Sequence, residues 1–350
     1  MSTALPNLKS LTSIALKEQI ALWGVEGYRY DQLYQWIYQK DIEDFDQITN
    51  LSKDLKIKLK ENFVLERWEP SQIQTSQDGT KKFLFKLNDQ ESVESVLIPN
   101  GPRQTLCISS QVGCAMACSF CLTGRLGLTR NLSHFEIVEQ VMAVRRYVAS
   151  EVRISNIVFM GMGEPMHNLK NVLEALRFLE NERGLNFSKN KITVSTCGLV
   201  PQMLEFGKQS QVKLAISLTG TTDEQRNPLI PINRRYPLET LMEACRQYPL
   251  PGRGRITFEY TLLKDINDSL EDAARLKKLL YQIPAKVNLI PFNEYPGAIY
   301  QRTSEARMLA FQKYLLDRGL QTNIRHSRGL DILGACGQLK AAMEPKRTLK

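Results

Sequence analysis

The chain has 350 residues, a net charge of +9, 43% apolar and 24% charged residues, a composition typical of globular proteins with a sizeable core. No apolar run approaches the roughly 18 residues that span a bilayer, and the N-terminus lacks the pattern of a signal peptide. These features exclude membrane-embedded and secreted classes, so we expect a cytoplasmic protein, and the excess of Lys and Arg favours a polyanionic partner.

The first hundred residues predict helices followed by strands. Apolar residues recur at helical spacing over 14–23, 30–38 and 54–63. The segment 73–99 then alternates between apolar and polar residues, with a Gln77-Asp78-Gly79 turn separating strand-like runs. We therefore expect a helical accessory domain over 1–65, in possible contact with RNA, and a β extension over 66–100.

From residue 106 onward, β-branched runs alternate with helical segments, which predicts an α/β fold with a parallel sheet, either open or closed toward a barrel. Ser133 and Glu136 form a capping box that predicts the start of a helix. We expect a core domain over 101–340 and a basic tail over 341–350. The predicted strands are 106–110, 154–160, 191–196, 212–218, 255–263, 286–292 and 322–326.

Three cysteines, Cys114, Cys118 and Cys121, follow the first of these strands at C-x3-C-x2-C spacing. Structural zinc prefers four protein ligands, and no second cysteine pair is present. Three thiolates without a fourth suit a [4Fe-4S] cluster with one open iron, since cluster irons normally take four cysteines. A zinc site remains the alternative.

This spacing resembles the signature of the radical S-adenosylmethionine (SAM) superfamily. The resemblance implies a partial (βα)6-type barrel, and a cluster whose open iron binds SAM and cleaves it to a 5′-deoxyadenosyl radical. Further residues at strand ends resemble SAM contacts of the superfamily, although each also suits an ordinary turn or cap. They are Gly163 and Glu164 in a glycine-rich turn, Ser195, the Ser217-Leu218-Thr219 segment, and Asn293.

Two more cysteines and one glutamate are candidates for chemistry. Cys107 lies in an apolar strand, where a cysteine is often a small buried apolar residue. Cys336 stands in a small-residue segment, GACG, which suits a thiol that must move toward a substrate. Glu94 lies in an alternating strand, where a solvated carboxylate is the ordinary interpretation.

The order of motifs over nearly the whole chain is similar to the RlmN-type dual-specificity 23S rRNA/tRNA adenine-C2 methyltransferases. The resemblance rests on ESVLIP (94–99), TLCISSQVGCAMACSFCLTG (105–124), FMGMGEP (159–165), VSTCGLVP (194–201), AISL (215–218), IPINRRYPL (230–238), FEYTLL (258–263), NLIPFNEYPG (288–297) and ACGQL (335–339).

That resemblance implies a mechanism with two SAM molecules. One methylates Cys336, and the radical from the second takes a hydrogen atom from the new S-methyl group, whose carbon then adds to C2 of adenine. Glu94 removes the C2 proton, and Cys107 releases the RNA by forming a transient disulfide with Cys336. The targets implied are adenosine 2503 of 23S rRNA and adenosine 37 of tRNA.

The family often carries His or Asn where this chain has Thr219, and no chemistry is assigned to Cys197 or Cys245. We expect a monomer that is reduced by a flavodoxin or ferredoxin and does not bind membranes. The alternatives are a C8 adenine methylase of the same family and a non-catalytic, metal-containing RNA-binding protein.

Overall fold

The computed structural model describes residues 5–149 and 151–340. The predicted basic tail, 341–350, lies outside the described residues.

The N-terminal module is helical, as predicted. Thr12 and Ser52 accept hydrogen bonds from backbone N–H groups at the starts of the first and third helices, so both starts are capped. The second helix begins before the predicted segment and winds into a π-helical turn over Gln35–Gln39. The helices are α1 (Ser13–Leu22), α2 (Tyr28–Tyr34) and α3 (Lys53–Asn62).

A buried ion pair fastens this module to the rest of the protein. The Lys9 ammonium lies 2.9 Å from the Glu139 carboxylate, and both side chains are about 1% exposed. Burial lowers the pKa of Lys9, while Glu139 opposes that effect. Tyr34 stacks on Phe178 with ring centroids 5.5 Å apart. The module and the sheet therefore share one continuous hydrophobic core.

Ten strands form one sheet in which the spatial order follows the chain order. The first four strands pair antiparallel, and the pairs from β4 through β12 are parallel. The strands are β1 (Gln72–Thr75), β2 (Lys81–Lys86), β3 (Ser92–Asn100), β4 (Arg103–Cys107), β7 (Asn156–Phe159), β8 (Ile192–Thr196), β9 (Lys213–Ser217), β10 (Ile256–Leu262), β11 (Ala285–Pro291) and β12 (Thr322–Ile324).

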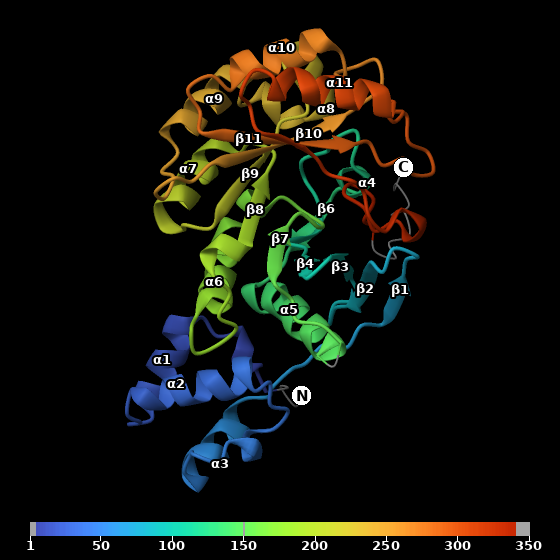
Figure 1. Cartoon of the computed structure of the whole chain (residues 1–350). Helices are drawn as coiled ribbons and strands as arrows, with labels where there is room; N and C mark the ends of the chain where they lie inside the picture. Colours follow the sequence, from blue (N-terminus) through green and yellow to red (C-terminus); the bar gives the residue numbers. More distant parts are fainter. Residues whose placement is uncertain (1–4, 150, 341–350) are drawn as a thin grey trace, which may run out of the picture.

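Helices connect the parallel strands and cover one side of the curved sheet (Figure 1). Within the described residues β1 and β12 end the strand order at opposite edges, so the sheet is an open, partial barrel, as predicted. The helices are α5 (His134–Val148), α6 (Leu169–Glu180), α7 (Val200–Gln209), α8 (Asp223–Leu229), α9 (Leu238–Gln247), α10 (Leu270–Leu279) and α11 (Glu305–Leu316).

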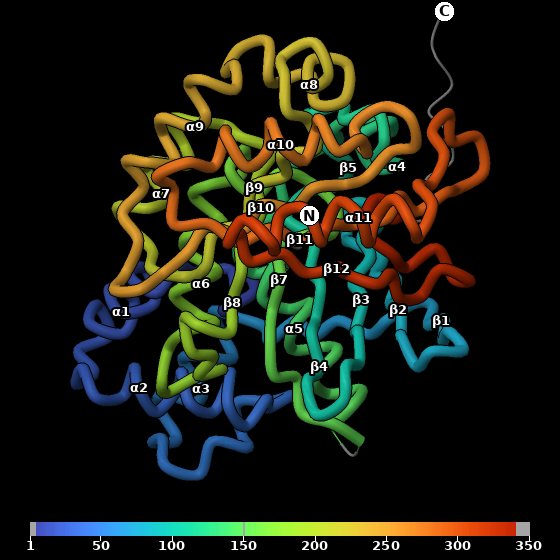
Figure 2. Tube along the Cα trace, turned by 45° about the horizontal axis from the view of Figure 1, so that its top comes forward, coloured from blue at the N-terminus to red at the C-terminus, as the bar shows by residue number. Residues whose placement is uncertain are grey.

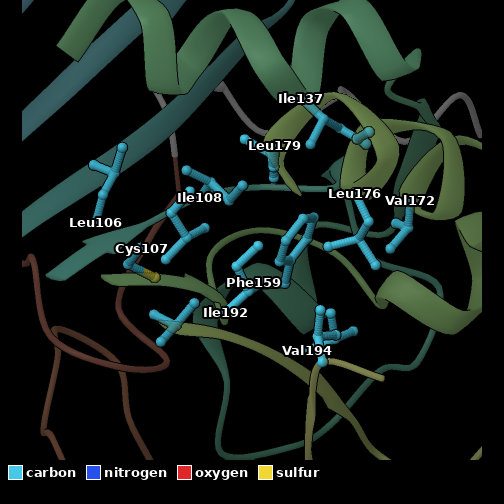
Figure 3. Packing of buried hydrophobic residues seen from close by; sticks show 14 of the residues in the cluster. Leu106, Cys107, Ile108, Ile137, Phe159, Val172, Leu176, Leu179, Ile192 and Val194 are labelled. Carbon is cyan, nitrogen blue, oxygen red and sulfur yellow. The ribbon is translucent and has the colours of Figure 1, made fainter. Parts of the chain in front are cut away.

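Alternation along β4 decides which side chains face the helices. Figure 3 shows Leu106 and Ile108 among the apolar residues of the sheet, α5 and α6. Because successive side chains on a strand point to opposite faces, Cys107 faces the inside of the barrel. Val96 of β3 pairs with Cys107, so Glu94, two residues before it on β3, shares this inner face.

Some elements differ from the sequence prediction. The Gln77–Gly79 turn joins β1 to β2, and a second turn over 87–91 joins β2 to β3. A small antiparallel sheet of β5 (Gln111–Gly113) and β6 (Leu128–Asn131) frames the cysteine loop together with α4 (Leu122–Arg125). These short elements were not predicted, since three or four residues carry no readable period.

The chain returns to the antiparallel strands after β12, where both views place the C-terminal segment beside β1 and β2 (Figures 1 and 2). Asp331 accepts a hydrogen bond of 2.5 Å from the Ser76 hydroxyl, and Asp78 accepts one of 2.9 Å from the Gly329 N–H. The segment that contains Cys336 is therefore fixed across the inner face of the barrel. No helix of the described residues has the length and apolar character needed to cross a membrane.

Candidate active site

A cavity of about 930 Å³ opens at the carboxyl ends of the parallel strands, where folds of this kind place their chemistry. Most of the predicted site residues meet there, although they come from distant parts of the chain. The predicted residues in its lining are Cys114, Cys118, Cys121, Gly163, Glu164, Ser195, Ser217, Asn293 and Cys336.

The three cysteines lie on the loop between β5 and α4, on one wall of this cavity. The Cys114 N–H donates to the Gly127 carbonyl at 2.8 Å, and the Cys121 N–H donates to the Cys118 carbonyl at 3.1 Å. Gly124 is required behind them, because a Cβ there would lie 2.9 Å from the backbone of Cys118. Backbone hydrogen bonds and close packing thus fix the conformation of the loop.

The donor set fits an iron–sulfur cluster. Burial, together with the nearby Cys118, raises the pKa of Cys121 to about 11 and also raises the pKa of Cys114. Within the described residues, no three His, Cys, Asp or Glu side chains form a group that could hold a metal ion. A cluster does not require such a group, because its ligands need not converge on one atom. A cubane spreads its thiolate ligands over separate irons, and the open cavity beside the thiols leaves room at a fourth.

The glycine-rich turn after β7 packs directly on β5. Gly163 has a φ of +99°, and a Cβ there would lie 2.5 Å from Cβ of Gln111. The Gln111 amide oxygen accepts a hydrogen bond of 2.8 Å from the Glu164 N–H. Glycine is therefore required by both backbone conformation and space.

Replacing Gly163 with alanine is expected to destabilise the protein by about 2–3 kcal/mol, because alanine at positive φ is strained and its Cβ displaces Gln111. Denaturant unfolding of the protein without cofactors measures the change. Gly101→Ala is the control, since Gly101 has a φ of +58° and open space around it. Equal losses in both variants would show that the contact with Gln111 has no cost.

The Glu164 carboxylate is buried and braces two loops. It accepts hydrogen bonds from the N–H groups of Met166, at 3.0 Å, and Cys197, at 2.8 Å. Burial raises the pKa of Glu164, and these hydrogen bonds partly oppose the rise. Cys197, left without chemistry in the sequence analysis, also lines the cavity, whereas Cys245 is buried in α9.

Leu218 and Thr219 differ from the prediction, since neither belongs to the cavity lining. Thr219 is 1% exposed, and its hydroxyl accepts a hydrogen bond of 3.3 Å from the N–H of Thr261, a residue of the cavity lining. Its φ of +47° is a left-handed conformation that disfavours β-branched residues and is adopted more readily by Asn and His. Backbone conformation therefore explains why Asn or His suits this position.

Arg226 of α8 is a structural element of the site that sequence reasoning missed. Its side chain is fully buried and donates to the carbonyls of Leu218, at 2.9 Å, Cys197, at 2.6 Å, and Ser217, at 3.2 Å. It also donates to the Asn233 side chain at 2.7 Å. One guanidinium thus joins the ends of β8 and β9. No sequence signal distinguishes it from a surface arginine.

Cys336 lies in the wall between the large cavity and a second cavity of about 490 Å³, whose lining includes Cys107 and Arg325. Its carbonyl accepts a hydrogen bond of 3.0 Å from the Asn293 amide, which also accepts one from the Ser327 hydroxyl. Asn293 therefore positions the Cys336 segment in this state.

The residues that follow Cys336 bind the residues that follow Cys121. The Leu122 N–H donates to the Gly337 carbonyl at 2.7 Å, and the Thr123 hydroxyl donates to the Leu339 carbonyl at 2.5 Å. The thiol-bearing segment and the cysteine loop are therefore one hydrogen-bonded unit.

All seven cysteines are free, so the Cys107–Cys336 disulfide expected from the resemblance is absent from this structure. Burial, together with the nearby Cys336 thiol, raises the pKa of Cys107 to about 12, and Arg325 partly opposes this rise. Cys107 is thus a protonated, poorly nucleophilic thiol at neutral pH in this state.

We expect alkylation of Cys107 by iodoacetamide to be slow at pH 8 and to accelerate about tenfold per pH unit up to pH 11, because only the thiolate reacts. Mass spectrometry of peptides after timed labelling, with the cluster removed, measures the rate. Labelling in urea supplies the reference for an exposed thiol. A rate that levels off near pH 9 in the folded protein would contradict the raised pKa.

Glu94 is buried on the inner face of β3 but belongs to the lining of neither cavity. Its carboxylate lies 3.2 Å from the Lys82 ammonium and accepts a hydrogen bond of 2.9 Å from the Lys340 N–H. In this state the predicted base is therefore covered by the segment that follows Cys336.

The partial barrel and the cavity with three thiols define a radical SAM enzyme, and residues 108–276 match the family model of the radical SAM superfamily. Residues 6–65 match the model described as the ribosomal RNA large subunit methyltransferase N-terminal domain. A radical SAM methyltransferase from Sphaerobacter thermophilus has the same fold, with a TM-score of 0.89 and 43% identity, over 96% of this chain and 99% of that one.

Curated relatives identify the family. The chain is 52% identical over 342 residues to the dual-specificity RNA methyltransferase RlmN of Pelobacter propionicus, covering 97% of both proteins. It is 51% identical to RlmN of Geobacter sulfurreducens, over 97% of this chain and 93% of the relative. The chain belongs to the RlmN family of radical SAM RNA methyltransferases.

Proposed function

We propose that the protein methylates C2 of adenine in RNA, at adenosine 2503 of 23S rRNA and adenosine 37 of tRNA, by way of a methyl group carried on Cys336. The observation that supports this proposal is the place of Cys336, in the wall shared by the cavity of the three thiols and the cavity of Cys107. A thiol at this boundary can receive a methyl group on one side and present it to a base on the other.

In this proposal Cys114, Cys118 and Cys121 hold the [4Fe-4S] cluster, and Gly163, Glu164, Ser195, Ser217 and Asn293 contact SAM. When bound, these groups supply the methyl donor and the one-electron chemistry that an electron-poor carbon requires. Two SAM molecules are used per methyl group transferred. A flavodoxin or ferredoxin supplies the electron, and the protein acts as a monomer.

The chain's own residues perform the remaining steps. Cys336 forms the S-methylcysteine, and the carbon that it carries forms the bond to C2. Glu94 accepts the C2 proton, which requires that its contacts with Lys82 and Lys340 open. Cys107 resolves the bond between enzyme and RNA from the second cavity. The module over 1–65 contributes RNA contacts, and the β extension over 66–100 carries Glu94 to the core over 101–340.

An anaerobic reaction of the reconstituted protein with SAM, a low-potential reductant and either a 23S rRNA fragment or a tRNA tests the proposal. Nucleoside mass spectrometry is expected to detect 2-methyladenosine, and metal analysis about four irons and four sulfides per chain. Detection of 8-methyladenosine would instead establish a C8 methylase. Zinc without iron, or cleavage of SAM without methylated adenosine, would contradict the proposed function.

A further inference from the structure

The second cavity, which extends from Cys336 to the surface, is lined by both apolar and basic side chains. Its apolar side chains include Ile98, Met160, Ile290 and Leu339. Its polar rim comes from the Arg325-His326-Ser327-Arg328 segment after β12, and no Asp or Glu of the described residues lines it. The cavity therefore combines an apolar lining with a cationic rim.

The rim segment is held at both ends. The Arg325 N–H donates to the Leu289 carbonyl at 2.9 Å, and the Gly329 N–H donates to the Asp78 carboxylate at 2.9 Å. Gly329 has a φ of +67° and packs against Thr80, which leaves no space for a side chain. Arg328 thus projects from a fixed backbone.

Arg325 of the rim pairs with Glu259, whereas Arg328 has no acidic partner among the described residues. Arg328 and His326 are exposed, and neither side chain forms a hydrogen bond or ion pair with any other described residue. Asp331, the next acidic residue along the chain, is engaged by Ser76 and by the Gln77 N–H. Arg325 lies 4.0 Å from Glu259 and points into the cavity. Arg328 is therefore available to an anion from outside.

We propose that this cavity is the subsite for the target nucleotide, with the base on the apolar lining beside Cys336 and the nucleotide's phosphate on Arg328. The inference rests on the proposed function and adds the residue that positions the substrate. A guanidinium binds phosphate with two parallel hydrogen bonds, and apolar side chains accept the face of an unstacked base.

An RNA ligand suits this cavity better than the acidic surface of an electron-transfer protein. A protein surface needs a charged patch but no depth, whereas this rim encloses a cavity that reaches the thiol. The base must approach the Cys336 sulfur for a carbon–carbon bond to form, so the phosphate of the same nucleotide must lie near the mouth. Arg328 is the exposed cation in the cavity lining with the fork geometry for that contact.

The test compares the wild-type holoenzyme with Arg328→Gln and Arg328→Lys. Anisotropy measurements with a labelled 23S rRNA hairpin give the affinity as a function of salt. We expect Arg328→Gln to weaken binding about fivefold and to reduce the slope of log K against log salt by about 0.7–0.9, the value for one phosphate contact. Arg328→Lys should restore the slope. KM for RNA should rise about fivefold with kcat unchanged.

Arg253→Gln is the matched control, because Arg253 is also exposed but precedes β10 at the opposite end of the strands. Unchanged slope and KM in Arg328→Gln would overturn the subsite. A loss of rate with flavodoxin but not with a chemical reductant would assign Arg328 to the electron donor and also overturn it. Failure of the proposed function is distinct, since the wild-type protein itself would then yield no methylated adenosine.

Discussion

Replacing Cys336 with alanine is expected to abolish formation of methylated adenosine, with a loss greater than about a thousandfold. Cys336 is the one cysteine in the linings of both cavities, and no neighbouring thiol can carry a methyl group from one to the other. Nucleoside mass spectrometry after an anaerobic reaction measures the loss, and peptide mass spectrometry shows whether the wild-type cysteine carries a methyl group.

The fold should survive this substitution. The hydrogen bonds that hold the segment come from the backbone carbonyls of Cys336, Gly337 and Leu339, which alanine at 336 leaves in place. Iron content and SAM cleavage should therefore stay near wild-type values. Cys245→Ser, a change in α9 outside both cavities, is the control and should keep methylation. Methylated adenosine from Cys336→Ala protein would refute the role of this thiol.

Replacing Arg226 with alanine should lower the free energy of unfolding by about 3–5 kcal/mol. The substitution removes a buried cation and leaves the carbonyls of Cys197, Ser217 and Leu218 without this donor, in a region that water does not reach. Burial lowers the pKa of Arg226, because removing the charged guanidinium from water is unfavourable. The free energy of its hydrogen bonds must therefore offset this desolvation. Urea unfolding of the cofactor-free protein measures the difference.

The control for Arg226 is Arg183→Ala, which removes an exposed guanidinium and should change stability by less than about 0.5 kcal/mol. Because Arg226 joins the ends of β8 and β9, its loss should also weaken SAM binding to the reconstituted protein, measured by calorimetry. A stable Arg226→Ala protein with normal SAM affinity would show that these strand ends hold their positions without it.

The sequence predicted the elements that have strong periodicity. The parallel strands and the helices between them were found because buried strands read as short apolar runs and α5 begins with a capping box. Glu164, Ser195 and Ser217 were predicted to lie at one edge of the sheet, because they follow or end parallel strands and the carboxyl ends of parallel strands lie at the same edge. The cysteine loop was found from spacing alone.

The remainder depends on contacts that sequence does not encode locally. Thr219 follows Ser217 closely, yet it adopts a positive φ and does not line the cavity, and φ cannot be read from residue type. Arg226 acts through carbonyls of other strands, which have no side-chain signature. The hydrogen bond between the Lys340 N–H and the Glu94 carboxylate links residues 246 positions apart, and no periodic pattern in the sequence predicts such a contact.

The bond between Thr123 and Leu339 spans 216 positions, and this separation bears on the order in which the protein can mature during synthesis. A ribosome releases the cysteine loop long before it makes the segment that completes the loop's hydrogen bonds. A nascent or truncated chain therefore presents its three thiols on an unfinished frame. The frame that would hold the proposed cluster is therefore completed only when the segment around Leu339 has been made.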